Sequence, residues 1–230
     1  MRAGSLALWR AAPWLRDTVV LAVVDPGVGT PRRPVAIEVA GARTVLVGPD
    51  NGLLLPSAHA LDRPTTAVRL RPLEPPPDVP VGVGATFDGR DLFSPVAARI
   101  AAGEWTLDDA GDPIDPGTLV GQPVPTPSPD GYGGLRCEVL WVDRFGNAQL
   151  NARPTDTARL GERVSVFIGD DPAPCRARHV RAFGELEPGE LGLVVDSYGL
   201  LALAFDGSPA ASRLEISEGG PVRIARTGDD

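Results

Sequence analysis

Two polar turns near the N-terminus carry residue types that could perform acid–base chemistry. Asp25 follows the apolar residues 18–24 and opens the turn Asp-Pro-Gly-Val-Gly, with Arg32 seven residues further on. Asp50 and Asn51 lie in the turn Gly-Pro-Asp-Asn-Gly, which follows the apolar residues 44–47. A carboxylate can orient or deprotonate a water molecule, while a nearby guanidinium stabilises hydroxide-like charge. A purely structural interpretation is also open, because Asp-Pro-Gly and Asn-Gly are common turn sequences.

A third candidate is the segment Thr-Phe-Asp-Gly-Arg-Asp at residues 86–91, which contains Asp88. It places two carboxylates and one arginine directly before residues 93–102, which predict a helix. An ordinary surface ion pair is the alternative interpretation of this segment.

Two further turns lie in the second half of the chain. Asp143, Phe145 and Asn147 belong to the turn Asp-Arg-Phe-Gly-Asn and offer a carboxylate, an aromatic face and an amide. Such groups can bind an amino group, stack on a base and bond to its edge. Ser197 and Tyr198 lie in the turn Asp-Ser-Tyr-Gly before an apolar run. The alternatives are a hairpin turn with Phe145 in the core, and a serine that serves only the turn.

The elements that position these turns fall into two classes. Residues 18–24 have the continuous apolar pattern of a strand buried on both faces, as in a parallel sheet. With strands at 35–39, 44–47 and 67–70, they predict an α/β domain over residues 1–111, with a mostly parallel sheet flanked by helices. Residues 112–134, rich in proline and glycine, predict a linker. Short β-like runs at residues 135–230 predict a small all-β, barrel-like domain.

Composition narrows the function classes. The net charge is −8, and the 22 basic residues, all arginine, are nowhere concentrated, which argues against a nucleic-acid partner. The longest apolar run is far too short to cross a membrane. The two cysteines and two histidines have no zinc-site spacing, so we expect neither metal nor cofactor. Two separate cysteines predict reduced thiols and a cytoplasmic protein.

In their order and spacing the five motifs resemble the SAM hydroxide adenosyltransferase family, which is related to the fluorinase and chlorinase enzymes. The resemblance covers about residues 18–225. It implies an α/β domain, a β-barrel-like domain, and a homotrimer that binds S-adenosyl-L-methionine (SAM) between the first domain of one subunit and the second domain of its neighbour. The implied reaction is attack of water on C5′ of the ribose, which releases L-methionine and adenosine.

The resemblance also implies roles for individual residues. The family's catalytic Asp and Arg fall on Asp25 and Arg32, and its His falls on Asp88, because the usual motif reads Thr-Phe-His-Gly-Arg-Asp. Asp143 is placed near the methionine amino group and Ser197, followed by Tyr198, near the methionine carboxylate. Phe145 and Asn147 are placed near the adenine. Asp50 and Asn51 complete the predicted substrate-binding set.

Two departures from the family leave alternatives open. One is Asp88 in place of histidine. The other is the expectation that the family's first strand and helix, with an Asp-Phe-Gly motif, are missing ahead of residue 18. Together they favour, as an alternative to the hydrolase, a protein that binds SAM or adenosine without turnover. A SAM-dependent halide transferase is a further alternative, against which Arg32 beside Asp25 argues.

Overall fold

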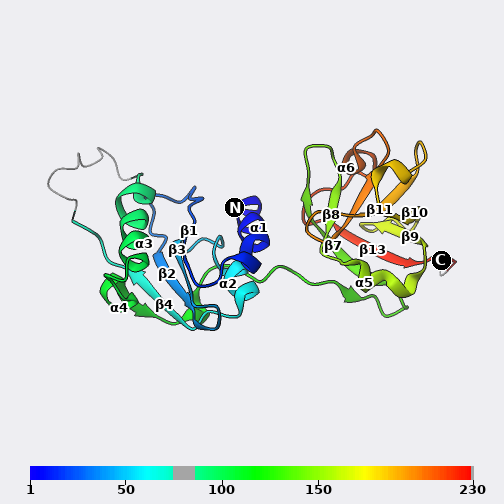
Figure 1. Cartoon of the computed structure of the whole chain (residues 1–230). Coiled ribbons are helices and arrows are strands. Elements are labelled where there is room, and N and C mark those ends of the chain that lie inside the picture. Colours follow the sequence, from blue (N-terminus) through cyan, green and yellow to red (C-terminus); the bar gives the residue numbers. More distant parts are fainter. Residues whose placement is uncertain (75–85, 229–230) are drawn as a thin grey trace. The chain divides into compact units, whose positions relative to one another are not determined.

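Two sheets organise the chain, one in each of the units Met1–Pro123 and Val124–Asp230 (Figure 1). The computed structural model describes residues 1–74 and 86–228. Each unit has its own hydrophobic core.

In the described part of the first unit, the sheet has five strands in the order β1–β3–β2–β4–β5. Its strands are β1 (Val19–Leu21), β2 (Pro34–Val39), β3 (Thr44–Pro49), β4 (Thr66–Leu70) and β5 (Gly111–Ile114). Strands β2 and β3 form the predicted hairpin, with Val35 opposite Gly48 and Val39 opposite Thr44. This hairpin ends next to Asp50, the first residue after β3.

Helices cover both faces of this sheet. Alternate residues of β2 point to opposite faces, so Val35 and Ile37 pack towards α2 (Leu55–Leu61), while Ala36 packs towards α3 (Ser94–Ala101). Helix α1 (Arg2–Ala11) and the short helix η1 (Ala12–Trp14) lie with α2, whereas α4 (Leu107–Ala110) precedes β5 (Figure 1). The first unit is therefore a three-layer α/β structure.

The predicted mostly parallel sheet is wrong in its strand directions. Among residues 1–74 and 86–123, only β1 and β3 are parallel, and the other three pairings are antiparallel. Strands β2 and β3 are joined by a short turn, which permits only an antiparallel pair, since a parallel pair needs a long crossover connection.

The prediction that residues 18–24 form a strand buried on both faces is also wrong. Strand β1 has three residues and lies at the edge of the sheet, where Leu21 is 43% exposed. Val23 and Val24, beyond its end, are exposed as well. A run of β-branched, apolar residues indicates a strand, but it does not distinguish an edge strand from a central one.

Part of the range predicted as a linker belongs to the two sheets. Within residues 112–134, β5 pairs with β4 in the first unit, and β6 (Ser128–Pro129) pairs with β7 (Leu135–Val142) in the second. Short strands that contain proline carry little apolar signal, because proline is depleted in strands and restricted to their edges.

The second unit contains a closed barrel of seven strands. The short strand β6 pairs with β7 but is not part of the ring. Neighbouring strands follow the order β13–β9–β10–β11–β12–β8–β7, and β7 pairs with β13 to close the ring. Besides β7, these are β8 (Ala148–Leu150), β9 (Arg163–Ile168), β10 (Cys175–Val180), β11 (Leu191–Val195), β12 (Leu201–Phe205) and β13 (Pro221–Arg226). Only β10 and β11 are parallel. The barrel-like domain is thus confirmed, with short helices α5 (Pro154–Thr157) and α6 (Ala210–Arg213) outside it.

Candidate active site

The loop after β1 folds back on itself and brings Arg32 to Asp25. The Asp25 carbonyl accepts from the Val28 N–H at 3.3 Å, and the Thr30 hydroxyl donates to the Gly27 carbonyl at 2.6 Å. A Cβ on Gly27 would lie 3.4 Å from the Thr30 hydroxyl and 3.5 Å from Cγ of Arg32, which are ordinary van der Waals distances and show that the turn packs against Arg32.

Arg32 bridges two carboxylates that are far apart in the sequence. Its Nε and one terminal nitrogen donate to Oδ2 of Asp25 at 2.8 Å and 2.5 Å, and the same terminal nitrogen also donates to Oδ2 of Asp88. The exposed fractions of the side chains are 11% for Arg32, 6% for Asp25 and 32% for Asp88. The structure therefore brings the three predicted catalytic residues into one cluster.

The electrostatics of this cluster favour the ionised guanidinium. Burial would lower the pKa of Arg32, but the hydrogen bonds and negative charges of Asp25 and Asp88 outweigh burial and raise that pKa above its ordinary value. Two carboxylates around one guanidinium leave the cluster with a formal charge of −1.

A π-helical turn positions Asp88, and a buried aromatic ring packs against Arg32. Asp88 directly precedes the π-helical turn Gly89–Phe93, which continues into α3. Ser94 donates its hydroxyl to the Gly89 carbonyl at 2.6 Å, and the fully buried Phe93 lies under the Arg32 guanidinium, 5.2 Å from ring centroid to Cζ. π-Helical turns are frequent at functional sites. Sequence reasoning missed Phe93 as part of the site, since it reads as an ordinary helix residue.

One oxygen of Asp25 has no protein partner. Oδ2 is held by Arg32, whereas Oδ1 is buried and accepts no hydrogen bond from residues 1–74 or 86–228. Buried carboxylate oxygens in native proteins normally accept at least one hydrogen bond. An oxygen fixed in this way can accept a hydrogen bond from a water molecule and orient or deprotonate it.

The Gly-Pro-Asp-Asn-Gly turn contributes to the site in two different ways. Asp50 is already satisfied by protein groups, since it accepts from Nε of Arg33 at 2.8 Å and from the Val120 N–H at 2.7 Å. Asn51 instead donates its amide to the carbonyl of Val24 at 3.0 Å, and so anchors the residue directly before Asp25. The structure therefore brings Asn51 next to the loop that contains Asp25, whereas Asp50 joins Arg33 to the backbone of Val120.

In the second unit, Asp143 organises the turn between β7 and β8. Its Oδ1 accepts from the N–H groups of Phe145 and Asn147 at 2.8 Å and 2.9 Å, and its Oδ2 accepts from the Asn147 side chain at 2.9 Å. The Phe145 side chain is consequently held outwards, and this residue is 65% exposed. The alternative that Phe145 is a core residue is therefore wrong.

Phe145 and Asn147 line a pocket of about 440 Å³ in the second unit. The other lining residues come from two further loops and the end of β12, namely Phe183, Phe205, Asp206, Gly207, Ser208 and Pro209. Three aromatic rings and several polar groups suit a flat heteroaromatic ligand. Sequence reasoning missed Phe183, Phe205 and Asp206, because no motif marks the loops that carry them.

Ser197 and Tyr198 lie in the turn between β11 and β12, and both are exposed. Asp196 closes this turn by accepting from the N–H groups of Tyr198 and Leu200 at 2.8 Å and 3.0 Å, and its other oxygen accepts from Gln149 of β8. Among the described residues, the lining of the aromatic pocket includes neither Ser197 nor Tyr198.

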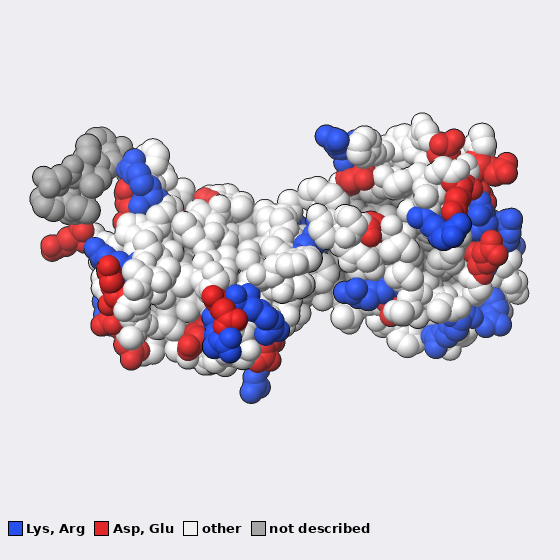
Figure 2. Space-filling model, viewed as in Figure 1, with Lys and Arg blue, Asp and Glu red and all other residues white. Residues whose placement is uncertain are grey.

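Other kinds of site find no support in the described part of the chain. No group of three or more His, Cys, Asp or Glu side chains there is arranged to hold a metal ion, and no helix there has the length and apolarity to cross a membrane. On the face shown in Figure 2, acidic and basic side chains are interspersed, without the continuous basic patch that nucleic-acid binding requires.

Comparison with known proteins agrees with this geometry. Residues 1–111 match the SAM hydroxide adenosyltransferase N-terminal domain, and residues 137–223 match its C-terminal domain. The chain is similar to two proteins that are each named (R)-S-adenosyl-L-methionine hydrolase. The protein from Salinispora tropica is 45% identical over 97% of this chain and 81% of its own length. The protein from Thermus thermophilus is 40% identical over 97% of this chain and 82% of its own length. A crystal structure of a conserved protein from Thermotoga maritima matches with a TM-score of 0.79 and 29% identity, over 98% of this chain and 84% of that one.

Proposed function

The chain belongs to the SAM hydroxide adenosyltransferase family, and from that premise we propose that Asp25, Arg32 and Asp88 catalyse the attack of water on its substrate. Relatives at 40–45% identity are named hydrolases of SAM, and this chain is likewise an enzyme that hydrolyses SAM to adenosine and L-methionine. Because those names specify the (R) configuration, we propose that this chain also acts on the (R) epimer.

The difficult part of this reaction is the nucleophile. The sulfonium of SAM leaves as a neutral thioether and needs no general acid, whereas water has a pKa near 15.7 and is a poor nucleophile. In the proposed mechanism, Oδ1 of Asp25 accepts a proton from the attacking water. Arg32 stabilises the negative charge that develops on the oxygen. The observation that carries this proposal is the buried and unpartnered Oδ1 beside an Oδ2 that Arg32 holds in place.

Asp88 has a supporting role in this mechanism. It accepts a hydrogen bond from the same Arg32 nitrogen that contacts Asp25, and it therefore fixes the direction of the guanidinium. Asp88 also lines a pocket of about 500 Å³ with Asp91 and Leu92, so its second oxygen is open to a water molecule. A cluster with net negative charge favours a cationic substrate over a halide ion.

The second unit supplies substrate binding in this proposal. The aromatic pocket with Phe145 and Asn147 is large enough for adenine, and its rings can stack on a purine. Asp143, Ser197 and Tyr198 are assigned to the methionine end, and Asp50 with Asn51 to the support of the catalytic loop. SAM then lies between units of different subunits in a homotrimer. The free thiols of Cys137 and Cys175 support a reducing compartment, which we propose is the cytoplasm.

The test of the reaction is incubation of the purified chain with each epimer of SAM in water enriched in ¹⁸O. Chromatography with mass spectrometry is expected to show adenosine and methionine in equal amounts, with ¹⁸O in the adenosine 5′-hydroxyl. Asp25→Asn is the control and is expected to form neither product. Added chloride that yields 5′-chloro-5′-deoxyadenosine would favour halide transfer, and tight SAM binding without any product would favour the non-catalytic alternative.

The shared site has a separate test by subunit mixing. Asp25→Asn disables the first unit and Phe145→Ala weakens the second, so each homotrimer is poorly active at low SAM. If each site combines two subunits, refolding an equal mixture restores roughly a quarter of the sites, because random mixing pairs intact units with that frequency. If each site lies within one chain, mixing restores nothing.

A further inference from the structure

The aromatic pocket of the second unit has rigid walls. Its two principal loops are clamped together, because the Ala211 N–H donates to the Gly146 carbonyl at 2.8 Å, and a Cβ on Gly146 would come within 2.3 Å of Cβ of Pro209. Arg213 covers one face of Phe205, with its Cζ 3.8 Å from the ring centroid. The pocket is thus held in shape before any ligand binds.

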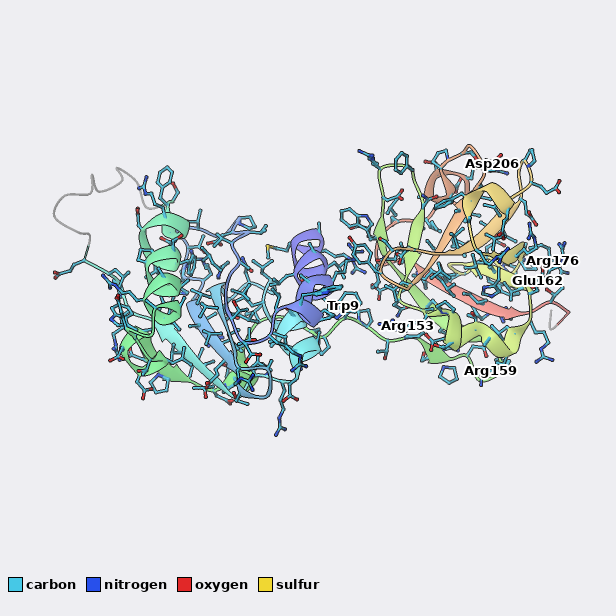
Figure 3. The ribbon with its side chains drawn as sticks, in the orientation of Figure 1. Trp9, Arg153, Arg159, Glu162, Arg176 and Asp206 are labelled. Carbon is cyan, nitrogen blue, oxygen red and sulfur yellow. The ribbon has the colours of Figure 1, made fainter. Side chains whose placement is uncertain are left out.

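The polar groups of this pocket are mostly acceptors. The Asn147 side chain donates its Nδ2 to Asp143, which leaves its Oδ1 as an acceptor without a partner among the described residues. Asp206, at the end of β12 beside α6 (Figure 3), is exposed, and within residues 1–74 and 86–228 its carboxylate has no hydrogen bond or ion pair. The Ser208 hydroxyl accepts from Arg213 at 3.3 Å.

We propose that Asp206 is a specificity-determining residue that selects adenine by its exocyclic amine; this proposal rests on the proposed function. Adenine presents two N–H donors on that amine, and the pocket presents two free acceptors, the Asp206 carboxylate and Oδ1 of Asn147. Hypoxanthine has a carbonyl oxygen at the same position, which would face these acceptors without a hydrogen. Sites with unpaired acceptors reject such analogues strongly.

The aromatic rings alone would not provide this selectivity. Stacking on Phe145, Phe183 and Phe205 is tolerant of base identity, because every purine has a π face. An exposed carboxylate at the rim of an aromatic pocket adds the missing directional acceptor. The sequence offers no motif at Asp206, and its role becomes visible only because three separate loops meet there.

The experiment compares adenosine with inosine in binding to the full chain by titration calorimetry. Wild type is expected to prefer adenosine, and Asp206→Ala is expected to reduce that preference about tenfold by weakening adenosine binding only. Asp206→Asn, which keeps one acceptor but loses the charge, should fall between them. Asp170→Ala removes another exposed carboxylate of the same unit and should leave the ratio unchanged. Thermal unfolding of each variant checks that the barrel is intact.

A second arm measures kcat/KM for SAM against S-inosyl-L-methionine in the same variants. An unchanged adenosine-to-inosine ratio in Asp206→Ala would overturn the proposal, even if hydrolysis of SAM proceeds normally. A tenfold loss of the ratio in the binding arm would support it, even if the wild type proved unable to hydrolyse SAM. The two proposals can therefore fail separately.

Discussion

The polar groups of the Asp25–Arg32–Asp88 cluster and of the aromatic pocket differ in how far the protein itself satisfies them. In the first unit, Asp25 and Asp88 are both bonded to Arg32, and Oδ1 of Asp25 is buried without a partner among the described residues. In the second unit, the acceptors of Asn147 and Asp206 lie open beside exposed aromatic rings. The carboxylates of the first unit are thus held by protein hydrogen bonds before substrate arrives, whereas the open acceptors of the second unit can gain hydrogen bonds only from a ligand or water.

This difference separates catalysis from recognition. Groups that are fixed in advance stabilise a transition state without reorganisation, which is the larger part of many rate enhancements. Groups without partners gain their hydrogen bonds only on binding, and so determine which ligand is accepted. Changes in the cluster should therefore alter kcat, whereas changes in the pocket should alter KM and the choice of base.

The largest effect is expected from Asp25→Asn. The amide cannot accept a proton from water, so kcat for SAM should fall by about 10²- to 10⁴-fold. Adenosine affinity, which depends on the other unit, should change less than about twofold. Stopped-time product assays and calorimetry measure the two quantities. If adenosine affinity fell by as large a factor as kcat, the proposal that the first unit catalyses and the second unit binds the base would be contradicted.

Phe145→Ala should weaken adenosine binding and raise KM while leaving kcat nearly unchanged, the opposite of Asp25→Asn. Loss of one stacking ring is expected to raise the adenosine dissociation constant and KM by about ten- to a hundredfold. kcat at saturating SAM should stay within about twofold, since the cluster is untouched. Tyr132→Ala is the matched control, because Tyr132 is an aromatic residue of the same unit that is 86% exposed and lies outside the pocket lining. A similar rise in KM in that control would show a general effect on the barrel.

Asp88→Asn and Asp88→His test how far the cluster depends on its second carboxylate. The neutral amide still bonds to Arg32 but removes one negative charge, so we expect kcat to fall about tenfold with KM unchanged. Asp88→His restores the family pattern and is expected to keep activity within about threefold of wild type. Steady-state kinetics of both variants decide the point. Equal, severe losses in both would show that the carboxylate is indispensable in this chain.

The sequence predicted the proximity of Asp25 and Arg32 better than the directions of the strands. The spacing of Asp25 and Arg32 within one loop already placed a carboxylate beside a guanidinium, because a glycine turn of that length folds back locally. Asp88, 56 residues from Arg32, could be added only through the family resemblance, because nothing local brings it there. The order and direction of β1 to β5 depend on long-range pairing, which apolar runs do not encode.

In the second unit, the sequence predicts the strands of five or more residues as short β-like runs, but it does not predict β8. Its three residues, Ala148–Leu150, are too few to show a period of two, yet they provide the pairing that joins β7 to β12. Phe183 and Asp206 reach the pocket from separate loops and so carry no spacing signal. Asp50 shows the converse case, since a motif residue proves to be bonded to Arg33 and Val120.

The smallest expected effect concerns stability and sharpens the comparison of the two units. His179 of β10 is partly buried, its Nε2 has no partner among the described residues, and burial lowers its pKa below 6.5. Below pH 6.5 the unfolded chain binds this proton more readily than the folded barrel does. Stability therefore rises with pH through this window and falls as the pH drops from about 6.5 towards the lowered pKa of the folded state.

His179→Gln removes the proton-binding group, and should therefore reduce the loss of thermal stability between pH 7 and pH 5.5. Hydrogen exchange is expected to locate the wild-type loss in amides of β9, β10 and β11, and to leave β2 and β3 unaffected. His59→Gln is the matched control in the first unit, where His59 is exposed on α2. If the amides of β2 and β3 exchange together with those of β10 in acid, the two units unfold cooperatively. Protonation of His179 would then destabilise the first unit as well as the barrel.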